Sequence, residues 1–197
     1  MNQQSRSFIL ASLFGLFLTS AATSAAAADT YTLDPAHTQT IFTINHLGFS
    51  TVTGSMRDLK GTLLLDSQQP ENSSVTVTMN PNNVDTGFAA RDADLRSPTF
   101  FNTAQFPTMT FKSTRVTKTG DKTSDVQGDF TMLGVTRPVT LKVILNRIAQ
   151  DTVGTNVYKV GFTGTTAIKR SDFGMKAYLP YVGDDVSITI NFEGIKQ

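Results

Sequence analysis

The sequence predicts an all-β domain whose antiparallel strands close into an eight-stranded barrel. Over most of the 197 residues, apolar side chains alternate with polar ones, which is typical of strands with one buried face. Turn residues such as Gly120-Asp121 and Gly183-Asp184 separate about eight such segments. Eight strands make an antiparallel barrel just wide enough for one small ligand. A two-sheet sandwich with a filled centre is the alternative that this pattern leaves open.

The predicted strands follow one another along the chain with the same period. The last is the clearest, because every second residue from Val186 to Phe192 is apolar and the residues between them are polar. Val139 to Leu145 repeats this pattern with threonine and lysine between the apolar positions. The eight predicted strands occupy residues 37–47, 59–65, 75–79, 109–116, 126–132, 139–146, 158–169 and 186–193.

One polar stretch, residues 86–98, interrupts the strands and has a helical composition. It contains Arg91, Asp92 and Arg96 and leads directly into Phe100 and Phe101. A long connection inside a compact β domain is unusual and often functional. If the strands close into a barrel, this segment is expected to form a short helical lid over its mouth.

The first residues have the features of an export signal. Arg6 provides the positive start, an apolar run extends from Phe8 to Leu18, and Ala25-Ala26-Ala27 ends it with small side chains. Cleavage near Ala27 or Ala28 would separate a signal peptide, residues 1–28, from one domain, residues 29–197. No later stretch approaches the roughly 20 apolar residues of a membrane-spanning helix, so we expect a mature product that does not span the membrane.

Composition disfavours several classes of function. Removing the signal leaves 16 of the 17 basic groups against 16 acidic ones, without the concentrated basic surface that nucleic-acid binding requires. The chain has no cysteine and no Gly-x-Ser-x-Gly motif, so the common activated nucleophiles are missing. It also has no glycine-rich loop of the nucleotide-binding kinds. These features predict a binding protein without enzymatic activity and without a bound cofactor.

Metal binding could draw on only two histidines, His37 and His46. Their odd spacing would place the two rings on opposite faces of one uninterrupted strand, so they could share an ion only across a bulge, with a carboxylate such as Asp34. We therefore predict no metal site. His46 continues the face of Phe42 and Ile44, which makes it either a core histidine or a polar group that orients a ligand inside the cavity.

Two clusters of polar and charged residues contain arginine. Arg91 and Arg96 belong either to a solvated helix face or to the rim of an apolar mouth, where a guanidinium could bind the polar or phosphorylated head of an amphiphile. Arg170-Ser171-Asp172-Phe173-Gly174 forms the second cluster, and its expected role is to close a turn through an Arg170–Asp172 bond.

Ordered motifs along the whole mature chain resemble the YceI family of exported bacterial proteins. The resemblance is carried by Tyr31-Thr32-Leu33-Asp34 with His37, Phe42-x-Ile44-x-His46-x-Gly48, Arg91-Asp92-x-x-Leu95-Arg96-Ser97, Phe100-Phe101, Phe106-Pro107-x-x-Thr110-Phe111, Gly134-Val135-Thr136-x-Pro138 and Arg170-x-Asp172-Phe173-Gly174. Asp94 and Thr99 depart from the family pattern, which makes head-group preference the least transferable feature.

The resemblance implies a lipocalin-like barrel with a long apolar pore that holds a polyisoprenoid, a quinone-like molecule or another long-chain amphiphile. It also implies a periplasmic location, no enzymatic activity and a cytochrome b561-type membrane protein as a partner. The oligomeric state stays open, with a homodimer among the options. The residues expected to contact the ligand are Phe42, Ile44, His46, Arg91, Asp92, Leu95, Phe101, Phe106, Met109, Phe111, Ile168, Arg170 and Phe173.

Two other functions remain open at this point. The first is a stress-responsive module whose barrel is packed solid and whose lid docks a partner protein. The second is a metal-dependent hydrolase in which His37, His46 and Asp34 converge. A continuous apolar tunnel would favour the carrier over both.

Overall fold

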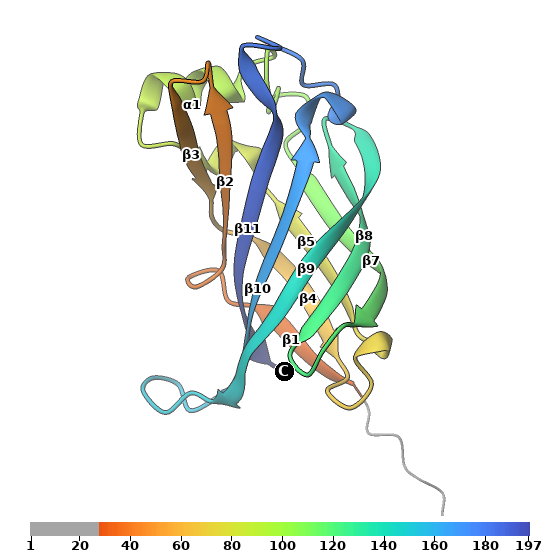
Figure 1. Cartoon of the computed structure of the whole chain (residues 1–197). Helices are drawn as coiled ribbons and strands as arrows, with labels where there is room; N and C mark the ends of the chain where they lie inside the picture. Colours follow the sequence, from red (N-terminus) through yellow and green to blue (C-terminus); the bar gives the residue numbers. More distant parts are fainter. Residues whose placement is uncertain (1–27) are drawn as a thin grey trace, which may run out of the picture.

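A computed structural model describes residues 28–197, so the predicted signal peptide at residues 1–28 lies almost entirely outside the described part of the chain. Figure 1 shows an elongated barrel of strands with a short helix at one end. The strands are β1 (Asp29–Leu33), β2 (Gln39–His46), β3 (Ser50–Met56), β4 (Lys60–Leu65), β5 (Ser74–Met79), β6 (Val84–Asp85), β7 (Met109–Lys118), β8 (Thr123–Met132), β9 (Val135–Gln150), β10 (Tyr158–Lys169) and β11 (Val182–Lys196). The helical segments are α1 (Ala89–Arg96) and the 3-10 turns η1 (Pro70–Asn72), η2 (Pro81–Asn83) and η3 (Arg170–Phe173).

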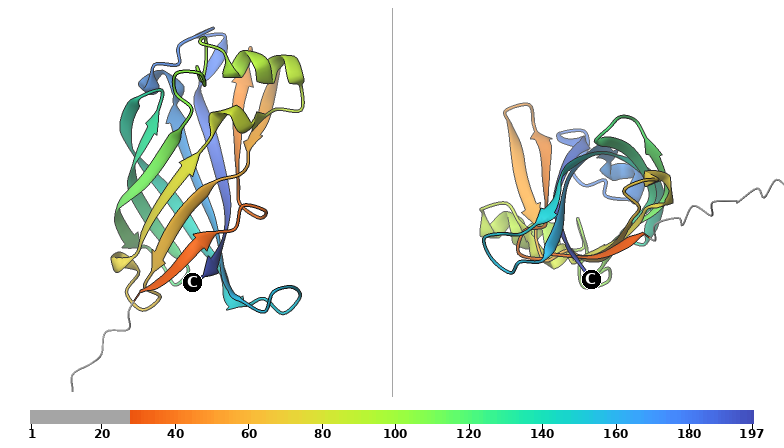
Figure 2. Two further views of the ribbon diagram at one scale, coloured as in Figure 1. Left: turned by 180° about the vertical axis from the view of Figure 1, so that it is seen from behind. Right: turned by 90° about the horizontal axis from the view of Figure 1, so that it is seen from below.

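The strands form one antiparallel sheet that closes on itself. The closed ring has the order β1-β4-β5-β7-β8-β9-β10-β11, and the pairing of β11 with β1 completes it. The view along the axis in Figure 2 shows this ring as an open circle of strands. The prediction of an eight-stranded antiparallel barrel is confirmed, and the sandwich alternative is wrong.

The membership of the ring differs from the prediction at one strand. β11 is 15 residues long; its end, from Gly194, pairs with β1, and the part from Val182 to Asn191 pairs with β2. β2, β3 and β6 therefore form a short flap beside the ring (Figure 2), and β1 completes the ring in place of the predicted strand 37–47. β1 has only five residues, too few for the alternation to predict it.

Tight turns set the register of the flap. Leu47 and Gly48 both have positive φ, 56° and 76°, and the Phe49 N–H donates to the His46 carbonyl at 3.0 Å. These are the features of a two-residue hairpin turn that requires left-handed backbone at both positions, which glycine adopts at little cost. The turn projects Leu47 and Phe49 from the tip of the β2–β3 hairpin.

Period-two alternation places the apolar faces of the strands inside the barrel. The even-numbered apolar side chains of β11 and the odd-numbered ones of β9 from Val139 to Leu145 all face the interior. On β3, Gly54 lies opposite Phe42, and a Cβ at Gly54 would come within 2.2 Å of the Phe42 ring. Because glycine has no side chain, the Phe42 ring can lie across β3 at this position.

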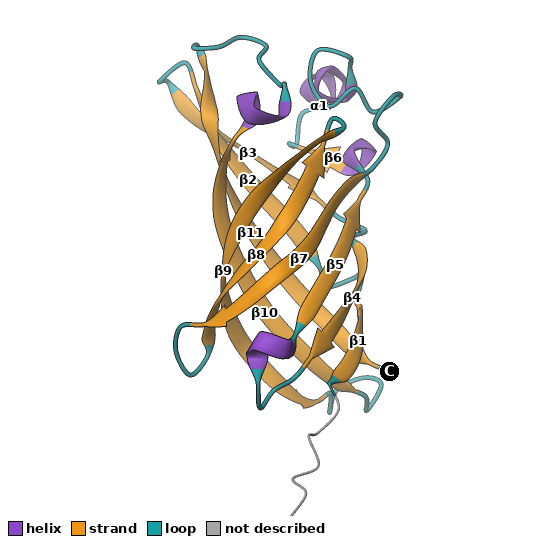
Figure 3. Cartoon of the chain, turned by 90° about the vertical axis from the view of Figure 1, so that its right-hand side faces the viewer, coloured by secondary structure: helices purple, strands orange, loops and turns teal. Residues whose placement is uncertain are grey.

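The predicted helical interruption forms α1, within residues 86–98, and α1 lies at the end of the barrel where the β2–β3 hairpin also ends (Figures 1 and 3). The loop that follows folds back on the helix, since the N–H groups of Phe101 and Thr103 donate to the carbonyls of Leu95 and Arg96. We call residues 86–108 the cap segment. Within residues 28–197, no helix combines the length and the apolar character needed to cross a bilayer.

Candidate functional site

The barrel encloses a cavity of about 680 Å³, within the range of roughly 300–1,000 Å³ that is typical of small-molecule sites. It extends from Phe88 and Leu95 in the cap segment to Leu65 and Leu145 at the other end of the barrel. The barrel is therefore hollow, and the predicted alternative of a solid barrel is wrong. The apolar side chains along its length include Phe42, Ile44, Leu59, Leu63, Val77, Met79, Met109, Phe111, Val126, Phe130, Leu141, Val143, Phe162, Ile168, Ile188, Ile190 and Phe192.

Most of the side chains predicted to contact a ligand line this cavity. They come from β2, the cap segment, β7, β10 and η3, which lie far apart in the sequence. The lining members of the predicted set are Phe42, Ile44, His46, Arg91, Leu95, Phe101, Met109, Phe111, Ile168 and Arg170. His46 is exposed at the cap end, so the interpretation of His46 as a core histidine is wrong.

Three predicted residues do not line the cavity. Phe173 is buried behind the wall, where it packs edge-to-face on Phe130 with ring centroids 5.3 Å apart. Phe106 lies against the β8–β9 turn, because a Cβ at Gly134 would meet its ring at 3.0 Å. Asp92 is buried within the cap segment. The sequence predicted these side chains near the site, but only the fold shows that Phe173 and Phe106 pack outside the cavity and that Asp92 lies within the cap segment.

Arg91 is the cationic group of the cap segment that borders the cavity. Its Nε donates to the Thr86 hydroxyl at 2.7 Å and its Nη2 donates to the Thr86 carbonyl at 2.9 Å. The guanidinium also lies over the Phe88 ring, 5.7 Å from the centroid. These contacts fix the side chain and leave Nη1 without a protein partner among residues 28–197, which makes Arg91 able to meet a polar ligand atom at the mouth.

Asp92 stabilises the cap segment from inside. Its Oδ1 accepts from the Thr86 N–H at 2.8 Å and from the Thr86 hydroxyl at 2.6 Å. The Thr86 hydroxyl bond is the main reason that the pKa of the Asp92 carboxyl lies below its ordinary value, despite the opposing effect of burial. Arg96 binds the same region by donating to the carbonyls of Asn82 and Val84. Arg96 thus anchors α1 to η2 and β6, and Asp92 anchors it to Thr86, the residue after β6.

Replacing Asp92 with alanine should loosen the cap segment. Two donors of Thr86 lose their acceptor in a buried site, which costs roughly 1–3 kcal/mol. We expect D92A to lose that much stability in urea unfolding and to show faster amide hydrogen exchange in residues 86–103. D94A, at an exposed position of the same helix, is the matched control. Equal exchange in D92A and the parent would contradict the anchoring role.

Arg170 is a structural side chain of the cavity wall, because the residue is 2% exposed and its guanidinium donates to four carbonyl groups. The acceptors are Gly183 at 2.8 Å, Met175 at 3.0 Å, Ala177 at 2.8 Å and Val182 at 3.0 Å. The predicted Arg170–Asp172 bond is therefore wrong. The neighbouring Ser171 instead binds Asp184, through its N–H at 2.9 Å and its hydroxyl at 2.7 Å.

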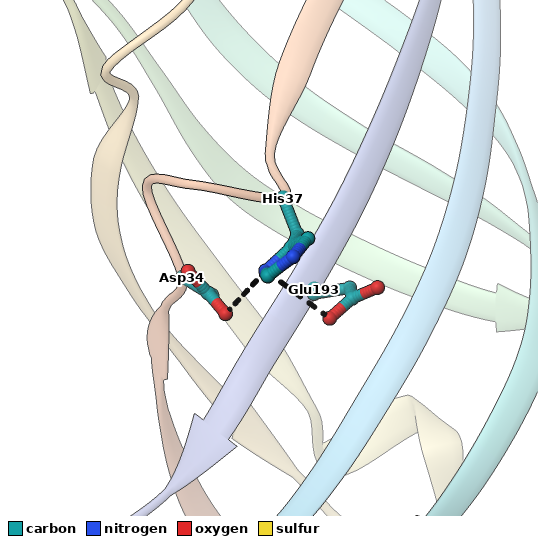
Figure 4. A group of neighbouring side chains, drawn as sticks. All are labelled: Asp34, His37 and Glu193. Atoms are coloured by element: carbon teal, nitrogen blue, oxygen red, sulfur yellow. Dashed lines mark hydrogen bonds and ion pairs between the residues drawn. The ribbon is translucent and has the colours of Figure 1, made fainter. Parts of the chain in front are cut away.

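A second polar cluster lies on the outer wall, beside the point where the pairing partner of β11 changes from β1 to β2. Figure 4 shows Asp34, His37 and Glu193, with His37 Nδ1 2.8 Å from Asp34 Oδ2 and 3.8 Å from Glu193 Oε2. The Lys159 ammonium lies 3.4 Å from Asp34 and 3.6 Å from Glu193 and pairs with both carboxylates. His46 lies at the cap end, so the arrangement of His37, His46 and Asp34 needed for a metal-dependent hydrolase does not form.

Hydrogen bonds and neighbouring charges shift the pKa values of Asp34 and His37 in this cluster. Burial alone would raise the pKa of the Asp34 carboxyl, but hydrogen bonds from His37, the Ala36 N–H and Lys159 outweigh burial and lower that pKa. The bond to Asp34 and the charges of Asp34 and Glu193 raise the pKa of His37 above its ordinary value. The cluster thus fixes the chain at the point where β1 ends and β2 begins.

His37 should therefore stabilise the fold most in mild acid. A histidine with a raised folded pKa stabilises fully below its unfolded pKa, about 6.5, and this contribution is lost as pH rises through the folded value. We expect the melting temperature of H37A to fall below that of the parent by more at pH 5.5 than at pH 9, as measured by circular dichroism. H46A controls for loss of a histidine elsewhere. A gap that widens with pH would contradict the assignment.

Sequence reasoning missed several lining residues. Gly164 and Thr166 occupy the same face of β10 as Phe162 and Ile168, so period-two alternation contains the signal, but a search for apolar side chains passes over them. Met175 and Tyr178 come from the irregular segment before β11, and no local pattern points to them.

Comparison with known proteins agrees with the motifs. The chain matches the YceI-like domain over residues 31–194. It is 41% identical over 191 residues to Protein YceI of Escherichia coli O157:H7, covering 94% of this chain and 98% of that one.

Two solved structures share the fold. Burkholderia cenocepacia BcnA aligns with a TM-score of 0.74 at 19% identity, over 82% of this chain and 98% of BcnA. A polyisoprenoid binding domain from Saccharophagus degradans, implicated in plant cell wall breakdown, aligns with a TM-score of 0.66 at 16% identity, over 87% of this chain and all of that domain (100%). At these identities the two structures support the fold alone. The family match and the 41% identity decide the membership: this chain belongs to the family of YceI-like domains.

Proposed function

We propose that this protein binds a polyisoprenoid, a quinone-like molecule or another long-chain amphiphilic lipid inside its barrel and carries it through the periplasm. The observation that carries the proposal is the cavity, about 680 Å³ in volume and lined mainly by apolar side chains along the whole barrel. The Saccharophagus degradans relative, which has the same fold, is a polyisoprenoid binding domain, and this agrees with the proposal.

Apolar burial is sufficient to explain affinity for such a ligand. A buried methylene contributes roughly 0.8 kcal/mol, so a fully desolvated five-carbon isoprene unit contributes on the order of 3–4 kcal/mol. Three or four units offset the roughly 4–15 kcal/mol that association costs. Polar contacts at the mouth are then free to select and orient the head group.

The polar groups at the cap end suit that second role. Arg91 offers a fixed guanidinium, and His46 and Asp94 also border the cavity there. A guanidinium binds phosphate or carbonyl oxygens with directed hydrogen bonds, whereas Asp94 disfavours a strongly anionic head close to it. Binding without chemical conversion of the ligand is the role that we propose for this site.

The proposed location rests on the predicted export signal, and the proposed partner rests on the family resemblance. The export signal predicted in residues 1–28 would deliver the protein to the periplasm, where a water-insoluble lipid needs a carrier between membranes. A cytochrome b561-type membrane protein is the proposed partner. The hollow barrel does not conflict with the other part of the alternative function, in which the cap segment docks a partner protein.

A chain-length series tests the proposal. The purified protein, freed of lipid by extraction, is titrated with fluorescent isoprenoid alcohols of increasing length. Affinity should rise by at least about tenfold per added isoprene unit, because even partial burial of one unit exceeds the 1.4 kcal/mol that corresponds to a factor of ten. The rise should stop once the chain fills the cavity. Weak binding that is independent of chain length would overturn the proposal.

A further inference from the structure

Large apolar side chains gather around the cap end of the barrel and face solvent there. They are Phe49, which is 89% exposed, Tyr181 (68%), Tyr178 (60%), Phe88 (59%) and Leu47 (45%). We call these five residues the apolar rim. Single exposed apolar residues are ordinary on protein surfaces, but a contiguous group of aromatic ones marks an interaction site.

The structure holds the rim residues in fixed positions. The two-residue turn presents Leu47 and Phe49, and the Leu47 N–H donates to the Tyr181 carbonyl at 2.9 Å, which joins the hairpin tip to the loop before β11. The Tyr178 ring lies 5.9 Å from that of Phe100, and Phe88 lies beneath the Arg91 guanidinium. The rim therefore needs little ordering when it contacts another surface.

The rim is continuous with the cavity mouth. Phe88 and Tyr178 belong both to the rim and to the cavity lining. Among the described residues, the other exposed large apolar side chains lie on strands of the barrel, except Val153, which is in the β9–β10 turn at the opposite end (Figure 1). Within residues 28–197, the exposed aromatic side chains that also line the cavity all belong to the rim.

We infer that the apolar rim docks the barrel, mouth first, on the surface of a phospholipid bilayer. Docking mouth first would let a lipid move directly between bilayer and cavity without crossing water. This part of the inference, which concerns the cargo, rests on the proposed function. Tyrosine and phenylalanine suit the boundary between headgroups and acyl chains. The mature chain has equal numbers of basic and acidic groups, so apolar insertion rather than attraction to anionic lipid drives the contact.

The chain contains no tryptophan, so one introduced indole reports on one site. We would compare F49W, in the rim, with V153W, where the native side chain is 98% exposed at the other end of the barrel. Each protein is mixed with phosphatidylcholine vesicles that carry bromine at shallow or deep acyl positions. Interfacial side chains lie about 5–10 Å inside the headgroup boundary, so shallow bromines should lower F49W emission by roughly half and leave V153W unchanged.

A second pair of variants removes the rim instead of labelling it. F49S/Y181S should lose cosedimentation with the same vesicles, whereas V153S should bind as the parent does, and circular dichroism checks that each remains folded. Equal quenching of F49W and V153W, or full binding by F49S/Y181S, would overturn the docking. So would an F49W emission that shifts with protein concentration in the absence of vesicles, because a second copy of the chain would then cover the rim.

Failure of docking can be separated from failure of the proposed function. The isoprenoid titration needs no vesicle, and bromine quenching needs no cargo. Lost quenching with an intact chain-length series overturns the docking alone. If quenching is intact but affinity does not depend on isoprenoid chain length, the carrier proposal is overturned and the bilayer contact is still supported.

Discussion

Replacing Arg170 with alanine should cause the largest loss of stability of any single substitution considered for this protein. The guanidinium is almost fully buried and donates to the carbonyls of Gly183, Met175, Ala177 and Val182. Burial lowers the pKa of Arg170, and the charge of Asp184 opposes this shift. Removing the side chain leaves one buried and three partly buried acceptors unpaired, and an unpaired buried acceptor costs roughly 1–3 kcal/mol. We expect R170A to lose about 3–5 kcal/mol, a large part of the 5–15 kcal/mol typical of a domain.

Urea unfolding followed by circular dichroism measures this effect. The neighbouring K169A is the matched control, because Lys169 pairs with Asp185 at 2.8 Å in an exposed position. Exposed pairs contribute at most about 1 kcal/mol, so K169A should remain close to the parent. The stability of R170K should lie between that of R170A and that of the parent, since an ammonium cannot reach four carbonyls at once. A loss below about 1 kcal/mol in R170A would contradict the structural role of this side chain.

Filling the cavity at Thr166 should weaken ligand binding strongly without unfolding the barrel. Thr166 lines the cavity from β10, opposite Ile188 on β11. An indole at this position would displace about one isoprene unit and forgo roughly 3–4 kcal/mol of burial. T166W should therefore bind a long isoprenoid two to three orders of magnitude more weakly than the parent. Its stability should change little, because the added ring enters space that is already open.

Thr165 provides the matched control for this substitution. It is the next residue along β10 and points outward, so T165W adds the same indole to the outer wall. The isoprenoid titration should give T165W the affinity of the parent. If T166W and T165W bind equally well, the ligand does not occupy the barrel, whatever its affinity for the protein.

Much of this fold could be predicted because period-two alternation has a direct structural meaning. The alternating side chains of β9 and β11 point into the barrel as the pattern predicts, and Phe42 and Ile44 do so on β2. β1, β3 and β6 were not predicted. β1 and β6 are short, and β3 carries mostly small and polar side chains. Their pairing depends on neighbours that only the closed ring provides.

The candidate site could be predicted only in part, because lining a cavity is a tertiary property. Alternation separates inside from outside but cannot distinguish a wall residue from one that packs behind it, as Phe173 packs behind Phe130. Likewise, no sequence spacing indicates that Arg170 binds carbonyls of a later loop rather than Asp172. The apolar rim also escapes prediction, since it is assembled from three segments distant in sequence.

Native mass spectrometry of the protein recovered after export with its own N-terminal segment tests the central claim most directly. The claim is that the barrel holds one long-chain lipid. The expected spectrum shows protein plus one apolar molecule, which collisional activation releases and which T166W lacks. The same spectrum gives the number of subunits. Protein that carries no lipid, or T166W that carries the same lipid in the same amount as the parent, would contradict the account.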